Sequence, residues 1–435
     1  MSTRRWTSSG QRYPRCWKGP ESVPPTDRFA PPPSLLTGKR IVLGVTGGIA
    51  AYKAADHASY LAQQGVDLRV VMTAAATRFV GPMTFEAITR QPVYRDVFDG
   101  WAGEEAGHVT LAASADAVIV APATANTIAR MAQGMVDDML TATLLATQAP
   151  IIVAPAMEHH MWHHPATRAN IELLRSRGVT IVEPESGHLA SGANGDGRLT
   201  SRDRIVAAVR EQLARGGPLA GRKVVVSAGG THEAIDPVRF IGNRSSGQMG
   251  VALADAAFDA GADVVSVVGP TVTVPPMVGR VERCESAREM SALVQEETGD
   301  ADVLIMAAAV ADFRPESAVA SKIKKGPGDD APIVRLTRNP DILATVKRDG
   351  LFLVGFAAET DDLVANSQAK LQAKALDMLV ANDAVATIGS ANSQATLLFA
   401  NGDVIQLPLL AKAELARVIV HQLIPALPEA ERKDA

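Results

Sequence analysis

Two segments of this chain share the same order of residue types, and that order strongly limits the possible fold. Lys39 to Lys53 reads KRIVLGVTGGIAAYK, and the segment from Gly221 to Gly250 opens with GRKVVVSAGGTHEA. In each, a basic residue precedes an apolar run of strand length, which leads through a Gly-rich turn into a helical pattern. Loops of this kind cradle phosphate groups at the N-terminus of a helix. Because the order occurs twice, in different sequences, it predicts two nucleotide-type domains in one polypeptide, each with its own site.

Strand-like and helix-like stretches alternate after each opening. The strand-like runs are IVLGV, DLRVVM, AVIVA, PIIVAPA and VTIVEP in the first half, and KVVVSA, DVVSVVG, VLIMAAA, FLVGFAAE and MLVAND in the second. This alternation predicts parallel sheets, and a Gly- and Pro-rich linker at residues 213–222 separates the halves. We therefore predict an α/β fold with two doubly wound (Rossmann-like) domains, at residues 36–215 and 216–435. The second is expected to end in a hairpin that turns at Asn401-Gly402.

Composition limits the class of protein further. The net charge of −4 gives no general attraction to nucleic acid or acidic membranes, and no apolar run approaches the roughly 18 residues of a membrane span. The two cysteines, Cys16 and Cys284, form no CxxC pair, which favours a reducing cytoplasm. Residues 1–35 are rich in Arg, Pro and Ser, and we expect them to be a disordered tail. The sequence thus predicts a cytoplasmic protein with small-molecule partners, not nucleic acid or membrane.

The residues at the ends of the second strands indicate which kind of nucleotide each half could bind. A dinucleotide site of the Rossmann type has an acidic residue there, which holds the ribose hydroxyls. The first half has Met72-Thr73 instead and the second has Val268-Gly269-Pro270. A hydroxyl at Thr73 better suits a phosphate or a flavin, so an NAD(P) reductase is disfavoured. The alternative is that the glycines only permit tight turns between strand and helix.

Three motifs of the first half, GVTGGIAAYK, APATANTIA and APAMEHHMW, resemble the signatures of the flavin-dependent cysteine decarboxylase family. The resemblance implies one bound FMN and the oxidative decarboxylation of a cysteine derivative. It assigns catalytic roles to His108 and Asn126 and the proton-donor position to Ser191, where many relatives have a cysteine. It also implies FMN contacts from Gly47, Gly48, Thr73, Thr124 and Asn126, and substrate contacts from Met157 and from Glu158, which replaces a usual asparagine.

The residues themselves leave two of these roles open. The Asn126 amide can donate and accept hydrogen bonds at once, which suits a substrate carboxylate, but it can equally cap the helix that follows. His108 suits proton removal near neutral pH, yet without the motifs it would be an ordinary surface histidine.

Four histidines, His159, His160, His163 and His164, include pairs with i, i+4 spacing, which can place two metal ligands on one helical face. Pro165 ends any helix promptly, and no acidic or thiol ligand stands at fixed spacing from them. The local sequence therefore argues against a metal site here.

In the second half, DPVRFIGNRSSGQMG, AAAVADFRP, KIKK, NPDI and GFAAET occur in the order found in bacterial phosphopantothenate-cysteine ligases, which this half resembles. The resemblance implies activation of a carboxylate by CTP with Mg²⁺, and catalytic roles for Asn243 and Lys322. The CTP-binding positions it implies are Met306, Ala307, Ala308, Asp312, Lys322, Asn339, Pro340, Asp341, Ile342, Phe356, Lys370 and Lys374. Read without it, KIKK is a solvated loop and Asn243 forms an Asx turn.

Together the halves resemble the bifunctional enzymes of coenzyme A biosynthesis, from about Leu36 to Ile424. The resemblance implies ligation of 4′-phosphopantothenate to cysteine in the second half, then decarboxylation to 4′-phosphopantetheine in the first. It also implies a homo-oligomer, a dodecamer built from decarboxylase trimers and ligase dimers. The rival interpretation is a non-catalytic flavin-binding scaffold or regulatory subunit.

Overall fold

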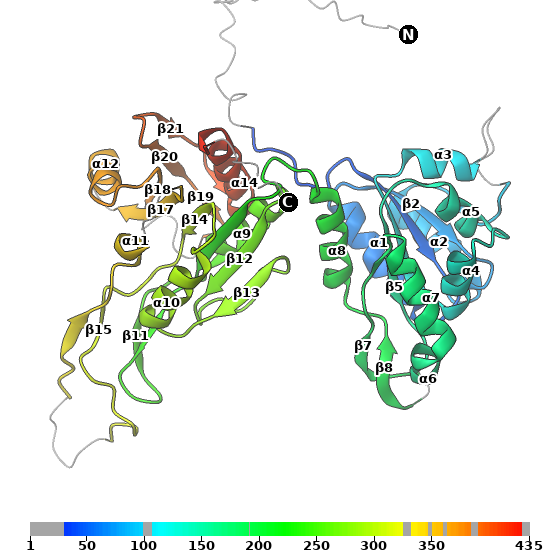
Figure 1. Cartoon of the computed structure of the whole chain (residues 1–435), viewed down its shortest axis with the longest axis horizontal. Helices are drawn as coiled ribbons and strands as arrows, with labels where there is room; N and C mark the ends of the chain where they lie inside the picture. The colour runs from blue at the N-terminus through cyan, green and yellow to red at the C-terminus, as the bar shows by residue number, and fades with distance from the viewer. Residues whose placement is uncertain are drawn as a thin grey trace, which may run out of the picture. The chain divides into compact units, whose positions relative to one another are not determined.

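The computed structural model describes residues 30–98, 107–190, 192–324, 332–346, 350–359, 363–383 and 390–428 (Figure 1). Most of the predicted N-terminal tail, Ser191 and Lys325 lie outside these ranges. The two halves are described separately below.

The first half is built on a six-stranded parallel sheet in the order β3-β2-β1-β4-β5-β6. Its strands are β1 (Arg40–Val45), β2 (Asp67–Met72), β3 (Val93–Tyr94), β4 (Ala117–Ala123), β5 (Ile151–Pro155) and β6 (Thr180–Ile181). The strand order reverses direction between β1 and β4. In doubly wound sheets, ligands bind in the crevice outside the carboxyl ends of the strands at that point.

Helices bury both faces of this sheet. They are α1 (Lys53–Gln63), α2 (Pro82–Thr89), α3 (Gly107–Ser114), α4 (Ala125–Gln133), α5 (Met139–Ala146), α6 (His159–His163), α7 (Pro165–Ser176) and α8 (Arg202–Ala214), with short 3₁₀ turns η2 (Ile49–Tyr52) and η3 (Ala76–Arg78). Along β1, Ile41 and Leu43 pack with residues of α1, α2 and α8, whereas Val42 packs with residues of α4, α5 and α7. Because both faces are buried, the strands are continuous apolar runs.

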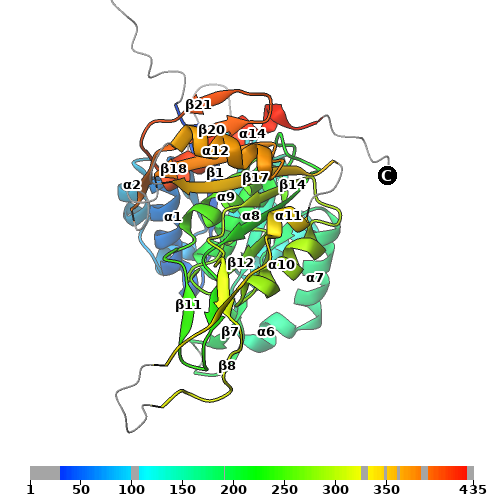
Figure 2. The same cartoon turned by 90° about the vertical axis from the view of Figure 1, so that its left-hand side faces the viewer.

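The second half has an eight-stranded sheet in the order β13-β12-β9-β14-β17-β18-β20-β21 (Figure 2). The strands are β9 (Lys223–Ala228), β12 (Asp263–Val268), β13 (Arg280–Arg283), β14 (Val303–Met306), β17 (Phe352–Glu359), β18 (Met378–Asp383), β20 (Ala395–Phe399) and β21 (Val404–Gln406). The first six are parallel, and β20 and β21 form an antiparallel hairpin at the edge. The strand order again reverses beside the first strand of the domain, between β9 and β14.

Helices and short ribbons complete this half. The helices are α9 (Gln248–Asp259), α10 (Ala287–Glu297), α11 (Ile342–Thr345), α12 (Leu363–Ala373) and α14 (Lys412–Leu423), with the 3₁₀ turn η4 (Ile424–Ala426). The ribbons pair β10 (His232–Ala234) with β11 (Phe240–Gly242), β15 (Phe313–Pro315) with β16 (Leu336–Arg338), and β19 (Asn392–Ser393) with β22 (Leu410–Ala411).

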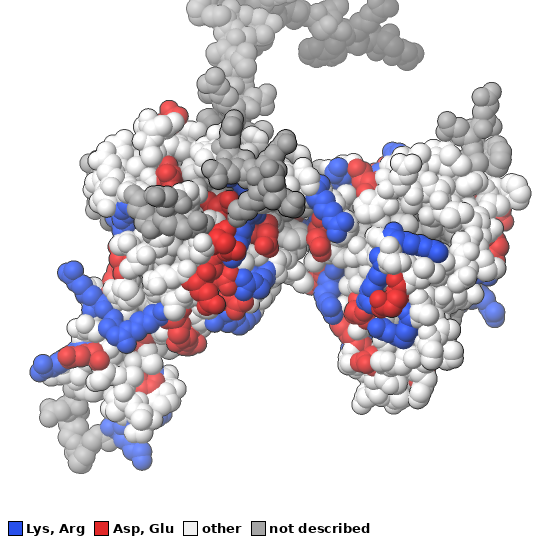
Figure 3. Space-filling model, in the orientation of Figure 1, with Lys and Arg blue, Asp and Glu red and all other residues white. Residues whose placement is uncertain are grey.

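The structure confirms the predicted fold class, including the hairpin that turns at Asn401-Gly402. It adds the short strand β3, the two-stranded ribbons and the hairpin of β7 (Glu185–His188) and β8 (Asn194–Arg198). Those strands were missed because they are short, and the 185–198 hairpin is rich in Gly and polar residues. None of the helices in the described ranges is long and apolar enough to cross a membrane. On the face drawn in Figure 3, acidic and basic side chains lie next to one another on both halves.

Candidate active sites

A buried hydroxyl links the strand ends at the crevice of the first sheet. Thr46 follows β1 and is fully buried. Its Oγ1 donates a hydrogen bond to the Pro122 carbonyl at 2.7 Å and accepts one from the Thr124 backbone N–H at 3.0 Å. These bonds fix the end of β1 against the end of β4. Thr46 was not among the predicted site residues, although it is the hydroxyl residue directly before the Gly-Gly turn.

The predicted flavin positions gather at this same edge. A Cβ on Gly47 would lie 2.3 Å from the Cβ of Ala75, so the loops after β1 and β2 touch there. A Cβ on Gly48 would meet only the Thr124 Cγ2, at 3.6 Å. The Thr73 hydroxyl, at the end of β2, accepts a hydrogen bond from the Ala76 N–H at 3.3 Å. Small residues at this edge are suited to the close approach of a flat ring system.

The alternative role for Asn126, capping the helix, is wrong because Thr124 is the N-cap of α4. The Thr124 hydroxyl accepts a hydrogen bond from the Thr127 N–H at 3.4 Å, and Thr127 is itself buried. Asn126 is exposed at the second position of the helix, and within the described ranges its amide has no hydrogen-bond partner. The amide is therefore available to a ligand at the end of β4.

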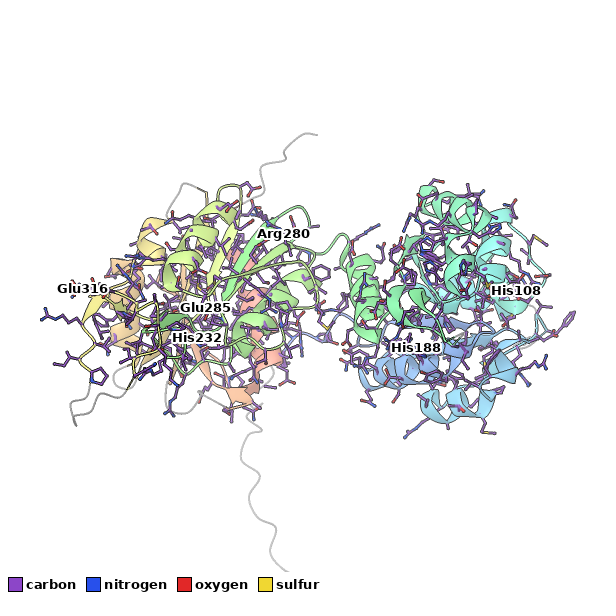
Figure 4. All side chains as sticks on the ribbon, turned by 90° about the horizontal axis from the view of Figure 1, so that it is seen from below. His108, His188, His232, Arg280, Glu285 and Glu316 are labelled. Carbon is purple, nitrogen blue, oxygen red and sulfur yellow. The ribbon has the colours of Figure 1, made fainter. Side chains whose placement is uncertain are left out.

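His108 lies at the second residue of α3 and is only partly exposed (Figure 4). Its Nδ1 is a buried atom with no hydrogen-bond partner among the residues that the structure describes. This environment does not fit an ordinary surface histidine, because a buried imidazole nitrogen without a partner costs free energy. Unsatisfied groups of this kind are typical of functional sites.

Glu158 is the N-cap of α6. Its carboxylate accepts hydrogen bonds from the backbone N–H groups of His160 (2.7 Å) and Met161 (3.4 Å), and it also contacts the His160 ring at 3.0 Å. Desolvation acts to raise the pKa of Glu158, but these hydrogen bonds outweigh it and lower the pKa. The preceding Met157 donates its backbone N–H to the Gly197 carbonyl at 3.0 Å. Strand β8 of the hairpin that contains the Ser191 position therefore packs on this segment, although Ser191 itself lies outside the described residues.

In the second half, a cavity of about 400 Å³ is lined by the loop after β14 and by residues of β17 and β18. Four predicted residues line it, namely Asn243, Ala307, Ala308 and Phe356. The loop before α9 forms another wall, with Arg244, Ser245, Ser246 and Gly247. A helix N-terminus beside small residues and a cationic side chain is suited to anion binding.

The Asn243 side chain does not form an Asx turn. Its Nδ2 donates to the carbonyls of Ala309 at 3.3 Å and Val310 at 3.0 Å, which holds the loop after β14 against the loop before α9.

The cavity lining also includes Lys412, the first residue of α14, whose Nζ lies 3.4 Å from Gln248 Oε1. Burial lowers the pKa of Lys412. No sequence pattern indicates Lys412, because it lies far along the chain and outside every motif.

Most other predicted CTP residues lie outside the cavity lining. Asn339 donates its backbone N–H to the Asp312 carbonyl at 2.8 Å, and Asp341 caps α11 and pairs with Lys374 at 3.1 Å. Pro340 lies between Asn339 and Asp341, Ile342 is buried in the core, and Met306 ends β14. Lys370 lies in α12, and Lys374 follows the end of that helix. The predicted set thus divides into residues of the cavity and a second cluster around Asp341.

The loop that contains Lys322 is held by a buried carboxylate. The side chain of Asp236, which has no exposed surface, accepts hydrogen bonds from the backbone N–H groups of Val238 (2.8 Å) and Ile323 (3.1 Å) and pairs with Arg239 at 2.5 Å. Desolvation acts to raise the pKa of Asp236, but these hydrogen bonds outweigh it and hold the pKa well below its usual range. Lys322 itself is exposed, as expected for a loop residue.

Side-chain contacts of His232 join β10 to β11 and to the chain before α10. The His232 ring stacks on Phe240 with centroids 3.6 Å apart, and its Nδ1 lies 3.4 Å from a Glu285 carboxylate oxygen (Figure 4). Sequence analysis singled out none of these three residues.

Two family models match successive parts of the chain. The Flavoprotein family matches residues 30–214, and the DNA/pantothenate metabolism flavoprotein C-terminal domain matches residues 219–426. Coenzyme A biosynthesis bifunctional proteins CoaBC are similar over most of the chain. The protein of Vibrio vulnificus (strain CMCP6) is 43% identical over 395 residues, which cover 89% of this chain and 98% of the relative. That of Bacillus subtilis (strain 168) is 42% identical, over 89% of this chain and 97% of the relative.

A further relative and a solved structure are also similar to this chain. The CoaBC protein of Mycobacterium tuberculosis (strain ATCC 25618 / H37Rv) is 45% identical over 79% of this chain and 86% of the relative. A crystal structure of the C-terminal domain of a CoaBC protein is 38% identical and has a TM-score of 0.42, covering 48% of this chain and 97% of that one. The extent and identity of the sequence matches show that the chain belongs to the family of bifunctional coenzyme A biosynthesis proteins.

Proposed function

We propose that the chain joins 4′-phosphopantothenate to cysteine in its second half and decarboxylates the product in its first half. The observation that supports this most strongly is the similarity to bifunctional coenzyme A biosynthesis proteins over 89% of the chain, with both family models matched in order. The final product would be 4′-phosphopantetheine.

The ligation would occur in the cavity beside Asn243. The carboxylate of 4′-phosphopantothenate attacks the α-phosphorus of CTP, and pyrophosphate leaves. The amine of cysteine then attacks the acyl carbon of the cytidylate, and CMP leaves. Asn243 would position the loop after β14 at the reacting carbonyl, since its amide already binds two carbonyls of that loop. Lys322 would close over the triphosphate from its exposed loop, and Mg²⁺ would enter with CTP, held mainly by phosphate oxygens.

The cluster around Asp341 and Lys374 would extend this site to the base and phosphates of CTP. Asp341 fixes the ammonium of Lys374 at 3.1 Å, and Asn339 orders the chain at Asp312. Lys370 would add a further cation. A site assembled from separate loops is suited to closure around a nucleotide, because water must be excluded from a hydrolysable acyl-cytidylate.

The decarboxylation would occur at the crevice between β1 and β4, and its residues fit a flavin. Gly47 and Gly48 provide a backbone surface without side chains, Thr124 caps the adjoining helix, and the Asn126 amide is available. FMN, when bound, supplies a two-electron acceptor that is restored in the same catalytic cycle. The imidazole of His108 would take a proton from the substrate, and Asn126 would orient the substrate carboxylate. Met157 and Glu158 would contact the rest of the substrate. The residue at the Ser191 position would return a proton to the product.

The test uses the purified full chain with 4′-phosphopantothenate, cysteine, CTP and Mg²⁺, and measures products by mass spectrometry. We expect CMP, carbon dioxide and 4′-phosphopantetheine, and none of these when CTP is omitted. His108→Ala should accumulate 4′-phosphopantothenoylcysteine with CMP, whereas Lys322→Ala should slow CMP release. CMP formation without decarboxylation in the unaltered chain would support the rival interpretation for the first half, a flavin-binding scaffold. No CMP at all would exclude the ligase activity.

The proposal extends to assembly and location. We propose a cytoplasmic homo-oligomer, a dodecamer of decarboxylase trimers and ligase dimers, which acts on small molecules only. Light scattering coupled to size-exclusion chromatography gives the mass directly. A monomer at working concentration would contradict this part of the proposal without affecting the chemistry.

A further inference from the structure

We propose that His159, His163 and Asp196 form a binding site for a divalent transition metal ion, and that zinc is the ion that fits best. The two histidines come from α6 and the aspartate from β8, which contacts that helix (Figure 1). One ligand atom from each of the three side chains lies within 4.8 Å of the others. Two imidazoles and one carboxylate are a ligand set that zinc uses in proteins, with its fourth position left to water.

The distances are near those of a bound ion. Nε2 of His163 lies 3.1 Å from Oδ2 of Asp196. Two ligand atoms bound tetrahedrally at about 2.0–2.1 Å from zinc lie roughly 3.4 Å apart, so this pair is close to the required separation. The His159 and His163 rings have centroids 4.5 Å apart, because i, i+4 spacing places them one helical turn from each other. The His159 ring has to turn from its hydrogen bond with the Asp196 N–H to complete the site.

Contacts with the hairpin and with Ser186 order the segments that carry the three ligands. Gly195 allows the hairpin strand to pass directly against the His159 ring, since a Cβ there would lie 2.8 Å from Nδ1. The Asp196 backbone N–H donates to that Nδ1 at 3.1 Å, so the nitrogen presents a lone pair towards the hairpin. Ser186 donates to the other carboxylate oxygen of Asp196, which leaves Oδ2 facing His163. Orientation of ligands by such partners is typical of metal sites.

The site is accessible to an ion from solvent. The side chains of His163 and Asp196 are 48% and 42% exposed, which leaves space for entry and for a bound water. The neighbouring Glu158 adds negative charge but is bound to His160 and to the helix N-terminus. A bound ion would join α6 to the hairpin, whose backbone contacts Met157 at Gly197. It would thereby restrict the segment that holds Met157 and Glu158.

The proposed site differs from the expectation from local sequence. Pro165 does end the helix, since α6 stops at His163 and α7 begins at Pro165. An acidic side chain does lie beside His163, but it belongs to Asp196, which lies 33 positions later and reaches His163 through the hairpin. No pattern of local spacing predicts that contact.

The test is a zinc titration of the purified full chain near neutral pH, by calorimetry and by competition with a chromogenic chelator. His163→Ala and Asp196→Asn remove one ligand each. His160→Ala is the matched control, because His160 is on the same helix with a side chain that is 90% exposed. Circular dichroism checks that each variant is folded. We expect one strongly bound zinc ion in the unaltered chain and in the control, with affinity reduced about 10-fold or more in both ligand variants.

The outcome does not depend on the proposed enzyme activities, because the readout is metal binding alone. Cobalt gives a second readout, since a tetrahedral site produces visible absorption bands that the ligand variants should lose. Equal zinc affinity in all four proteins, or loss of binding in the His160→Ala control, would overturn the assignment. So would the absence of stoichiometric binding in the unaltered chain.

Discussion

The two adjacent glycines at the flavin crevice provide a matched test of the site geometry. In Gly47→Ala the new methyl would lie 2.3 Å from the Ala75 Cβ and 2.8 Å from the Ala75 carbonyl carbon, so the loop after β2 must move. Forcing a methyl into packed structure costs about 1–3 kcal/mol. In Gly48→Ala the nearest atom is 3.6 Å away, which is ordinary contact, and the extended backbone there (φ −151, ψ 164) accepts alanine. We expect Gly48→Ala to cause no loss of stability.

Thermal unfolding followed by calorimetry measures the difference. For a domain of this size each kcal/mol shifts the melting temperature by about 2–4 °C, so Gly47→Ala should lower the transition of the first half by about 2–12 °C. Its flavin content after purification should fall as well, whereas Gly48→Ala should keep the melting temperature of the unaltered chain. Equal melting temperatures for the two variants would refute the argument that the loops after β1 and β2 touch at Gly47.

Three further predictions concern single side chains. Burial lowers the pKa of His57 from 6.5 to about 4, so the folded form binds its proton less readily than the unfolded chain. Stability should therefore fall as pH falls from about 6.5 towards 4, by at most about 1.4 kcal/mol per pH unit, and His57→Gln should flatten this dependence in pH-dependent melting. Burial raises the pKa of Cys284 to about 12, so peptide mapping after treatment with iodoacetamide should find it unmodified until the chain is unfolded; rapid modification of the folded chain would contradict this. Asp236→Asn removes the charge that binds the Ile323 N–H, so it should raise the KM for CTP and speed proteolysis after Lys322, while unchanged rates would refute the positioning role.

The core of each sheet could be predicted from sequence because buried parallel strands are continuous apolar runs. IVLGV and KVVVSA are examples, since helices cover both faces of the sheet and leave no polar side to the strand. The hairpin of β7 and β8 could not be predicted, because ESGH and NGDGR have neither apolar character nor alternation. Its conformation depends on contacts with α6 that are distant in sequence.

The residues of the candidate sites also divide into those that local sequence indicates and those that it does not. Gly47 and Asn243 belong to loops that directly follow a strand or precede a helix, so local patterns indicate them. Thr46 and Lys412 act through contacts with distant segments, to Pro122 and to Gln248, and no local signal shows which residues they meet. The cap could not be placed from sequence, because both threonine and asparagine are good N-cap residues; the structure has it at Thr124, two positions before Asn126.

The most direct test of the account follows the carboxyl carbon of cysteine through both reactions. The purified chain is incubated with 4′-phosphopantothenate, CTP, Mg²⁺ and cysteine labelled with ¹³C at the carboxyl group, and labelled carbon dioxide and CMP are measured together. We predict equal amounts of CMP and labelled carbon dioxide, with unlabelled 4′-phosphopantetheine as the product. Retention of the label in 4′-phosphopantothenoylcysteine, or release of labelled carbon dioxide without CTP, would contradict a chain that ligates first and then decarboxylates.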